Sequence, residues 1–253
     1  MTGVSVRDVS QRDRRVCLLT GAGGTLGSAF CRRFAGTYAI AAVYHHRLPG
    51  APTQHDRIFD PLDPHAMRTG DDTAVHAFPA DLSVAGDAER VVHEALARFG
   101  SIDLVVHAAA HAVWAPILGN GRLLASARRQ FDISVVAALE LATAVADRCW
   151  RGHEAENEAR NRNVVHLSSS AGVYVYPGQG QAVYAASKAA LNTLTCHMAD
   201  ELRPLGVRVN ALAPDSFPHR VSLDAVLDRI RALDESRVTG QIVVLEEAGE
   251  TLV

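Results

Sequence analysis

Short, continuously apolar runs alternate along this chain with longer stretches whose apolar residues recur at helical spacing. The apolar runs predict strands at Val16–Leu19, Tyr38–Tyr44, Val75–Phe78, Leu104–His107, Val164–Leu167, Val207–Leu212 and Gln241–Leu245. The stretches between them predict helices at Leu26–Phe34, Asp87–Phe99, Leu123–Trp150, Tyr184–Leu202 and Leu223–Leu233. Strands without polar alternation are typical of a parallel sheet that helices cover on both faces. The alternation therefore predicts an α/β fold with a doubly wound parallel sheet.

The chain has 253 residues and no internal repeat, which fits one domain of this class. Residues 1–14 are expected to be a flexible leader, and residues 15–253 to form the single domain. Two segments interrupt the alternation. Four prolines in Arg47–Asp72 argue against a full crossover helix there, and the polar stretch Arg151–Asn163 is expected to be an exposed excursion.

Composition argues against several classes of protein. A net charge of −3, with 48% apolar and 21% charged residues, is ordinary for a soluble globular protein and predicts no nucleic-acid partner. The four cysteines form no CxxC pair and have no histidine at zinc-binding spacing, so we expect no metal and a reducing compartment. The sequence shows no signal-peptide pattern and no membrane-spanning run, which predicts a cytoplasmic protein without a membrane partner.

A glycine-rich turn follows the first predicted strand and leads into a helix. Glycines at such a turn let the backbone approach a pyrophosphate, and the helix N-terminus stabilises its charge. A glycine cluster placed directly after the first strand of a strand–helix–strand chain is stronger evidence than the cluster alone. The turn therefore predicts a Rossmann-type domain. The residues expected to contact the dinucleotide here are Gly21, Gly24, Thr25, Leu26 and Gly27.

The end of the second predicted strand indicates which dinucleotide is preferred. An NAD site would place a carboxylate here to bind the ribose 2′-hydroxyl, and that carboxylate would repel a 2′-phosphate. The sequence instead has His45, His46 and Arg47. Arg47 stays ionised and can donate two hydrogen bonds to a phosphate. NADP(H) is therefore favoured over NAD(H).

A tyrosine and a lysine, Tyr184 and Lys188, begin a predicted helix four residues apart, which places them on one face. A phenol is a poor proton donor or acceptor near neutral pH, but a nearby ammonium favours its ionised form. The spacing alone is a common chance match. Its position adds meaning, because it follows a strand that ends in Ser168-Ser169-Ser170-Ala171-Gly172.

With these motifs the chain resembles the short-chain dehydrogenase/reductase family over nearly its whole length. Thr20–Gly27 reads TGAGGTLG, which has the glycine spacing of the extended branch, whereas the length and the later motifs look classical. Arg208–Pro214 and Val238–Gln241 are similar to two further family segments. The family fold is the doubly wound sheet, and its activity is hydride transfer between a nicotinamide and a carbonyl or alcohol.

The resemblance implies roles for individual residues. Ser169 and Tyr184 would polarise the substrate oxygen, with Ser168 or Ser170 in the place of Ser169 if the register shifts. Tyr184 would donate the proton, and Lys188 would lower the pKa of Tyr184 and hold the nicotinamide ribose. The implied cofactor contacts are Asp81 and Leu82 beside the adenine, Ala108, Ala109, Tyr184, Lys188 and Pro214.

Four departures from the family pattern bear on activity. The motif after the fourth strand reads His107-Ala108-Ala109-Ala110, and we expect His107 to be a buried histidine bonded to backbone rather than a catalytic one. Ser134 stands where the family asparagine helps to hold a water beside the lysine, so Ser134 is a candidate catalytic residue that would hold this water loosely. Asp215 replaces a glycine, and the segment from Pro214 to Val238 is about half the family length.

The shortened segment corresponds to the family's lid, so we expect an open site whose small-molecule substrate is bulky or is presented by a carrier protein. The leading prediction is an NADP(H)-dependent carbonyl reductase or alcohol dehydrogenase. A regulatory or structural dinucleotide-binding subunit without turnover is one alternative, and a non-redox lyase or epimerase is another. The helices at Leu123–Trp150 and Tyr184–Leu202 are the pair that builds the family's dimer interface, which predicts a homodimer or homotetramer.

Overall fold

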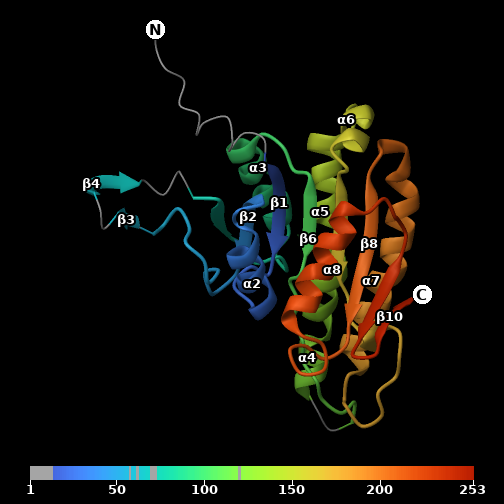
Figure 1. Ribbon diagram of the computed structural model, residues 1–253. Coiled ribbons are helices and arrows are strands. Elements are labelled where there is room, and N and C mark those ends of the chain that lie inside the picture. The colour runs from blue at the N-terminus through green and yellow to red at the C-terminus, as the bar shows by residue number, and fades with distance from the viewer. Residues whose placement is uncertain (1–13, 57, 61–62, 69–72, 119–120) are drawn as a thin grey trace.

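The computed structural model describes residues 14–56, 58–60, 63–68, 73–118 and 121–253, so the expected leader lies outside the described residues except for Arg14. An eight-stranded sheet in the order β10-β9-β8-β7-β6-β1-β2-β5 forms the centre of the molecule (Figure 1). Its strands are β1 (Arg15–Thr20), β2 (Tyr38–Tyr44), β5 (Val75–Pro79), β6 (Leu104–His107), β7 (Asn163–Leu167), β8 (Arg208–Pro214), β9 (Ile242–Glu246) and β10 (Gly249–Leu252). All neighbouring strands are parallel except the pair β9 and β10.

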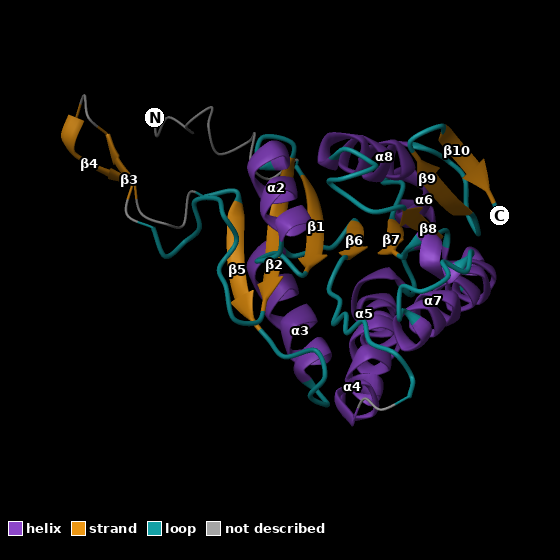
Figure 2. Ribbon diagram, turned by 90° about the horizontal axis from the view of Figure 1, so that it is seen from below, coloured by secondary structure: helices purple, strands orange, loops and turns teal. Residues whose placement is uncertain are grey.

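Helices cover both faces of this sheet, as Figure 2 shows. On one face lie α2 (Thr25–Phe34) and α8 (Leu223–Glu235), and on the other lie α3 (Asp87–Phe99), α5 (Ala137–Val145) and α7 (Ala182–Glu201). The predicted helix Leu123–Trp150 is a continuous run of α4 (Gly121–Phe131), the π-helical turn η2 (Asp132–Val136), α5 and a second π-helical turn, η3 (Ala146–Trp150). The single doubly wound α/β domain that the sequence predicts is confirmed.

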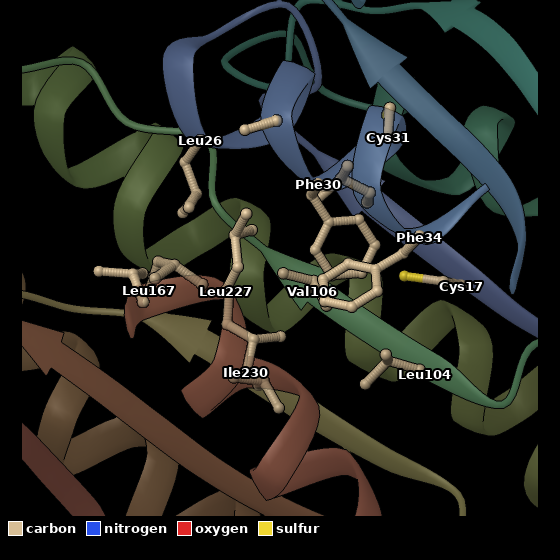
Figure 3. Close-up of a cluster of buried hydrophobic side chains, with 14 of the residues drawn as sticks. Cys17, Leu26, Phe30, Cys31, Phe34, Leu104, Val106, Leu167, Leu227 and Ile230 are labelled. Atoms are coloured by element: carbon tan, nitrogen blue, oxygen red, sulfur yellow. The ribbon is translucent and has the colours of Figure 1, made fainter. Parts of the chain in front are cut away.

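Two apolar cores follow from this layering, because both faces of each central strand are apolar. The first packs α2 and α8 on the sheet, and Figure 3 shows Phe30, Leu227 and Val106 meeting there. The second packs α3, α5 and α7 on the opposite face. In strand β6 the side chains alternate between the two cores, with Val106 in the first and Val105 in the second.

Two segments differ in part from the sequence pattern. The described residues of Arg47–Asp72 contain no helix, and β3 (Ile58–Asp60) pairs with β4 (Asp63–Arg68) in an antiparallel hairpin that stands away from the sheet (Figure 1). In Arg151–Asn163 the expectation of an exposed excursion is wrong for the second half. Here α6 (Glu154–Ala159) leads into a buried polar network.

This network lies at the amino-terminal edge of the sheet and is centred on the buried Asp103. Arg160 donates to both Asp103 carboxylate oxygens at 2.7 and 2.8 Å, and Arg162 lies 3.3 Å from one of them. The Val16 backbone N–H also donates to Asp103, at 2.9 Å. Burial alone would raise the pKa of Asp103, but these partners lower it. A second carboxylate, Asp234, receives the Arg15 guanidinium at 2.6 Å and the Tyr38 hydroxyl at 2.8 Å.

No helix in the described part of the chain combines the length and the apolarity needed to span a bilayer.

Candidate active site

The candidate site lies at the opposite edge of the sheet, where the parallel strands end. The loops that follow β1, β2, β5, β6, β7 and β8 all meet there, which is the edge where open α/β sheets bind their ligands. Two cavities occupy it, one over β1, β2, β5 and β6 and the other over β6, β7 and β8.

Glycine is required in the turn after β1 for two separate reasons. Gly21 has a φ of +70°, a conformation that favours glycine, and a Cβ there would also lie 2.8 Å from the carbonyl oxygen of Ala108. A Cβ on Gly27 would lie 2.3 Å from the carbonyl oxygen of Gly21. The turn therefore brings backbone against backbone at the N-terminus of α2, as a cradle for a pyrophosphate requires.

The first cavity, of about 840 Å³, follows this turn. Of the expected cofactor residues, the following line it: Gly21, Gly24, His45, His46, Arg47, Asp81, Leu82, Ala108 and Ala109. Other expected cofactor residues lie elsewhere. Leu26 and Gly27 are buried, Thr25 begins α2, and Pro214 and Tyr184 line the second cavity. In size, position and lining, the first cavity suits a dinucleotide's adenosine and phosphates.

Arg129 changes the charge of the cavity lining, and no pattern in the sequence had pointed to this residue. From α4 it donates to both carboxylate oxygens of Asp81, at 3.1 and 3.0 Å. Ser83 donates its backbone N–H and its hydroxyl to the same carboxylate, and His45 lies 3.4 Å from it. Burial would raise the pKa of Asp81, but the hydrogen bonds from Ser83 and Arg129 lower it to about 2. Asp81 is therefore an ionised but fully paired carboxylate.

The second cavity, of about 480 Å³, contains Ser169 and Tyr184. Ser169 follows β7 and caps a short 3-10 turn by accepting the Ala171 N–H at 3.2 Å, which fixes its side chain. Tyr184 lies in the first turn of α7 and lines the same cavity as Ser169. The Trp114 ring, 6.1 Å from that of Tyr184, is a wall residue that the sequence reasoning missed. The loop before α7 also lines the cavity, with Tyr176, Pro177, Gln179 and Gln181.

Burial is the largest influence on the pKa of Tyr184. Burial raises its pKa above the ordinary phenol value, and the neighbouring Ser169 hydroxyl opposes this only in part. Lys188 lies beneath the tyrosine with its ammonium 5.8 Å from the ring centroid, donating to the Leu167 carbonyl at 2.7 Å. Burial lowers the pKa of Lys188 to about 8. The lysine ammonium is thus directed to the end of β7.

His107 is buried and bonded to backbone, as expected. Its Nε2 lies 2.9 Å from the Ile133 carbonyl, and its Nδ1 lies 3.0 Å from the Thr20 hydroxyl. Ser134 is also buried, on the π-helical turn η2, and its hydroxyl has no hydrogen-bond partner among the described residues.

Asp215 lines the same cavity as the tyrosine. Its carboxylate accepts the Ser216 N–H at 2.7 Å, and it lies 3.5 Å from the Ser170 hydroxyl and 3.4 Å from Arg220. The Tyr176 hydroxyl donates to Ser170 at 2.9 Å and extends this polar chain along the cavity. The segment between β8 and α8 is only the short connection that the sequence predicts, and a few of its residues face the cavity: Asp215, Ser216, Phe217 and Arg220. Among the described residues, no group of three or more histidine, cysteine or acidic side chains is placed to hold a metal.

Comparison with known proteins gives the family. Residues 15–221 match the sequence profile of the short chain dehydrogenases. The chain is 28% identical over 208 residues to cyclohexanol dehydrogenase of Rhodococcus sp. (strain TK6), covering 79% of this chain and 73% of that protein. It is 31% identical over 205 residues to sorbitol dehydrogenase of Cereibacter sphaeroides, covering 80% of this chain and 70% of that protein.

Solved structures agree with this assignment. A short chain dehydrogenase/reductase family oxidoreductase from Brucella ovis, in complex with a partially ordered NAD, superposes with a TM-score of 0.68 at 26% identity, covering 92% of this chain and 99% of that one. The fold, the glycine turn and the sequence profile agree. The chain belongs to the short-chain dehydrogenase/reductase family, whose members are oxidoreductases that bind an NAD(P) dinucleotide and act on small molecules.

Proposed function

We propose that this protein is an NADP(H)-dependent oxidoreductase that interconverts a carbonyl compound and an alcohol with Ser169, Tyr184 and Lys188. The observation that carries the proposal is that Ser169 and Tyr184 line one cavity, which lies beside the cavity that the glycine turn builds. Two hydroxyl groups at one point can bind a single carbonyl oxygen, which is where negative charge develops during reduction.

The division of labour between protein and cofactor follows from this geometry. A bound nicotinamide supplies or accepts the hydride at the substrate carbon. The Ser169 hydroxyl donates a hydrogen bond to the substrate oxygen, and Tyr184 gives that oxygen its proton as the alcohol forms. Because Tyr184 and Ser169 come from α7 and from the end of β7, two rigid elements fix their separation.

The raised pKa of Tyr184 favours the reductive direction near neutral pH. A protonated phenol is the form that donates to a carbonyl, whereas alcohol oxidation needs the phenolate. We expect reduction to proceed at pH 7 and to decline as the pH rises through the pKa of Tyr184, which burial places above the ordinary phenol value. Oxidation should show the opposite dependence over the same pH range.

The charges in the first cavity support NADP(H). His46 and Arg47 line its ribose end, and the carboxylate of Asp81 is paired with Arg129. A 2′-phosphate therefore meets cationic and hydrogen-bond-donating groups and no unpaired carboxylate from the cavity's lining. Thr25, the first residue of α2, would hold the pyrophosphate through its backbone N–H group.

An apolar shelf extends the catalytic cavity and supports a substrate with an apolar body. This shelf, a cavity of about 760 Å³, shares Ala171, Tyr176, Pro177 and Gln181 with the site of Ser169 and Tyr184. Its exposed side chains include Leu118 at 88% and Val175 at 91% exposure. The loops that carry them are joined by a hydrogen bond from Ala115 N–H to the Gly180 carbonyl, at 2.8 Å.

The shelf predicts a chain-length dependence for straight-chain aldehydes or ketones. Each added methylene that reaches the shelf should raise kcat/KM roughly fourfold, which is the factor for burying about 0.8 kcal/mol. Val175→Asp should remove this gain for long substrates and leave the shortest substrate unchanged. A flat series with the parent protein would contradict the apolar substrate.

The experiment that tests the main proposal is a fluorescence titration with NADPH and NADH, followed by turnover on a panel of carbonyl compounds. The expected result is tighter NADPH binding, together with oxidation of NADPH that Tyr184→Phe abolishes while binding is kept. NADPH binding without turnover would instead favour a regulatory subunit, to which the pairing of Asp215 with Arg220 lends weight. Failure to bind either nucleotide would overturn both readings.

We place the protein in the cytoplasm as a homodimer or homotetramer. All four cysteines are free thiols, which suits a reducing compartment. Large apolar side chains are exposed along the run from α4 to α5, namely Leu124, Phe131, Val136 and Leu139. Light scattering after size exclusion should report more than one chain, and Leu139→Glu should shift the protein toward the monomer.

A further inference from the structure

The cavity that contains Ser169 and Tyr184 also carries a pair of charged side chains. Of the described residues that line it, two are charged, Asp215 and Arg220. The Arg220 guanidinium lies 3.4 Å from the Asp215 carboxylate. Both residues come from the short segment between β8 and α8, and the hydride transfer proposed above uses neither of them. Charged groups in a ligand cavity fix the orientation of the ligand and select it by charge.

Two apolar side chains hold the segment between β8 and α8 in place. Val221 is buried in the first core, and Phe217 packs against the same core while it lines the cavity. Between them the chain turns back, because the N–H groups of Arg220 and Val221 donate to the Ser216 carbonyl at 2.7 and 3.2 Å. The turn therefore keeps the backbone of Arg220 beside the cavity, while its side chain stays 65% exposed.

The Asp215 carboxylate already has donors at both of its oxygens. Its Oδ1 accepts the Ser216 N–H at 2.7 Å and lies 3.5 Å from the Ser170 hydroxyl. Its Oδ2 lies 3.4 Å from Arg220. The side chain is also only 14% exposed. Asp215 therefore has little capacity left to accept hydrogen bonds from a ligand, although its negative charge still acts on the cavity.

The Arg220 guanidinium, in contrast, has most of its donors free. A guanidinium carries five N–H donors. Within the described part of the chain, this one contacts Asp215 alone, and only at 3.4 Å. A planar carboxylate can accept two hydrogen bonds side by side from such a group, which makes the contact specific as well as favourable. Arg220 is therefore suited to bind an anionic group inside the cavity.

The charged pair and the apolar shelf lie at different ends of the site. Asp215 is close to Ser170, which follows Ser169 in the chain, so the pair lies at the end of the cavity where the substrate oxygen would bind. The described lining of the shelf includes neither Asp215 nor Arg220. A ligand that extends from Arg220 past Ser169 to the shelf has an anionic end, then a carbonyl, then an apolar chain.

We propose that Arg220 is a specificity-determining residue, which binds the carboxylate of an oxo acid whose alkyl chain lies along the shelf. This inference rests on the proposed function, since it names the substrate class of the same site. Asp215 holds the guanidinium at the cavity and partly offsets its charge. One guanidinium that is offset in this way suits a singly charged carboxylate better than a phosphate, which carries roughly two charges at neutral pH.

Binding is tested without turnover, using hexanoate and hexanamide, which have the same shape and differ in charge. The readout is the indole N–H signal of Trp114 in protein labelled with ¹⁵N-tryptophan, because Trp114 lines the cavity. The second of the two tryptophans, Trp150, is fully buried and donates to the Ile102 carbonyl, so its signal is an internal reference. Hexanoate should bind about fivefold more tightly than hexanamide, which is the upper range for an exposed ion pair.

Substitutions separate the effect of charge from that of shape. Arg220→Gln should remove the preference for hexanoate, and Arg220→Lys, which keeps the charge, should retain most of it. Asp215→Asn should increase the preference, because it removes a like charge while its amide oxygen can still accept the Ser216 N–H. Arg231→Gln is the control, since Arg231 lies on α8, is 52% exposed and pairs with Glu235. This variant should show the same preference as the parent protein.

Three outcomes would overturn the role of Arg220. The first is a parent protein that binds hexanoate and hexanamide equally. The second is an Arg220→Gln variant that keeps the preference for hexanoate. The third is an equal loss of preference in Arg220→Gln and Arg231→Gln, which would indicate a general effect of surface charge.

Turnover distinguishes this inference from the proposed function. With NADPH, at least one of 2-, 4- and 5-oxohexanoate should have a kcat/KM about fivefold or more above that of its amide, through KM, and Arg220→Gln should abolish the difference. Carboxylate binding that depends on Arg220 in a protein without reductase activity would refute the proposed function alone. An active reductase that reduces each oxo acid no faster than its amide would refute the role of Arg220 alone.

Discussion

Asp81 carries a negative charge into the cavity proposed to hold the dinucleotide. Its neighbours determine whether that charge repels a phosphate. Arg129, Ser83 and His45 surround the carboxylate. An unpaired carboxylate at the same place would repel a phosphate a few ångströms away. Arg129 therefore contributes to nucleotide preference without needing to touch the nucleotide.

Arg129→Gln should weaken binding of adenosine 2′,5′-bisphosphate roughly tenfold, because it uncovers the charge of Asp81 and removes a cation. Binding of 5′-AMP, which lacks the 2′-phosphate, should change much less. Isothermal calorimetry measures both affinities directly.

Arg128→Gln is the control for this change, because Arg128 is the preceding residue and its side chain is 93% exposed. The Arg128 variant should bind both nucleotides as the parent protein does. If Arg129→Gln weakens both nucleotides equally, the arginine shapes the cavity and does not select the phosphate.

At this scale the sequence predicts contacts within a motif better than contacts between motifs. The glycine turn and His45–Arg47 were found from spacing along the chain, and Asp81 from the family resemblance. All of them line one cavity except for the buried and helical part of the turn. Arg129 and Asp81 are 48 residues apart. No local pattern reports that pair, because it depends on how α4 packs beside the end of β5.

The buried imidazoles of His107 in β6 and His166 in β7 make the sheet itself sensitive to acid. Each histidine is held neutral, with its pKa lowered to about 3 mainly by burial. In the unfolded chain the same groups take up protons near 6.5. A base with a lowered pKa contributes stability that is fully present above 6.5 and is lost as the pH falls from there toward 3.

The free energy of unfolding should therefore fall by about 2 kcal/mol for each of these two histidines between pH 7 and pH 5. Urea titrations at the two pH values measure the change. The double variant His107→Asn/His166→Asn should have a flatter dependence, whatever its absolute stability. An unchanged slope in that variant would show that other groups bind the protons.

Regular elements were predictable because each central strand is apolar on both faces and each helix has one apolar stripe. Every predicted strand and helix exists within a few residues of its expected bounds. The elements that were missed are those whose stability comes from partners distant in sequence. The short helix α6 is held by Asn157, whose amide donates to the Trp150 and Leu205 carbonyls, and β10 only exists by pairing with β9.

Over the whole molecule, the two edges of the sheet have different tasks. At the amino-terminal edge, arginine–carboxylate pairs join β1 to α8 and join the connection between α6 and β7 to Asp103, just before β6. A hydrogen bond from Asn163 to Asp234 also joins β7 to α8. The carboxyl-terminal edge holds the cavities and the exposed apolar loops.

Asp103→Asn should destabilise the fold by roughly 3–5 kcal/mol, since it removes the buried carboxylate charge that pairs with both Arg160 and Arg162. Thermal or urea unfolding measures the loss. Asp147→Asn breaks an exposed pair with Arg151 and should cost less than about 1 kcal/mol. If both variants lost a similar amount of unfolding free energy, the buried network around Asp103 would not be what stabilises this edge of the sheet.

Because the two edges of the sheet are separate, the loops at the carboxyl-terminal edge can change without loss of stability. The arginine–carboxylate pairs around Asp103 and Asp234 lie a full strand length from the cavities. Replacing loop residues such as Trp114, Val175 or Phe217 therefore leaves these pairs intact. A library that randomises those loops should contain a high fraction of folded variants. A library that also randomises Asp103 or Asp234 should contain few folded variants. The amino-terminal edge of the sheet thus maintains stability while the loops at the carboxyl-terminal edge can change. New substrate preferences can therefore be selected in those loops without first restoring stability.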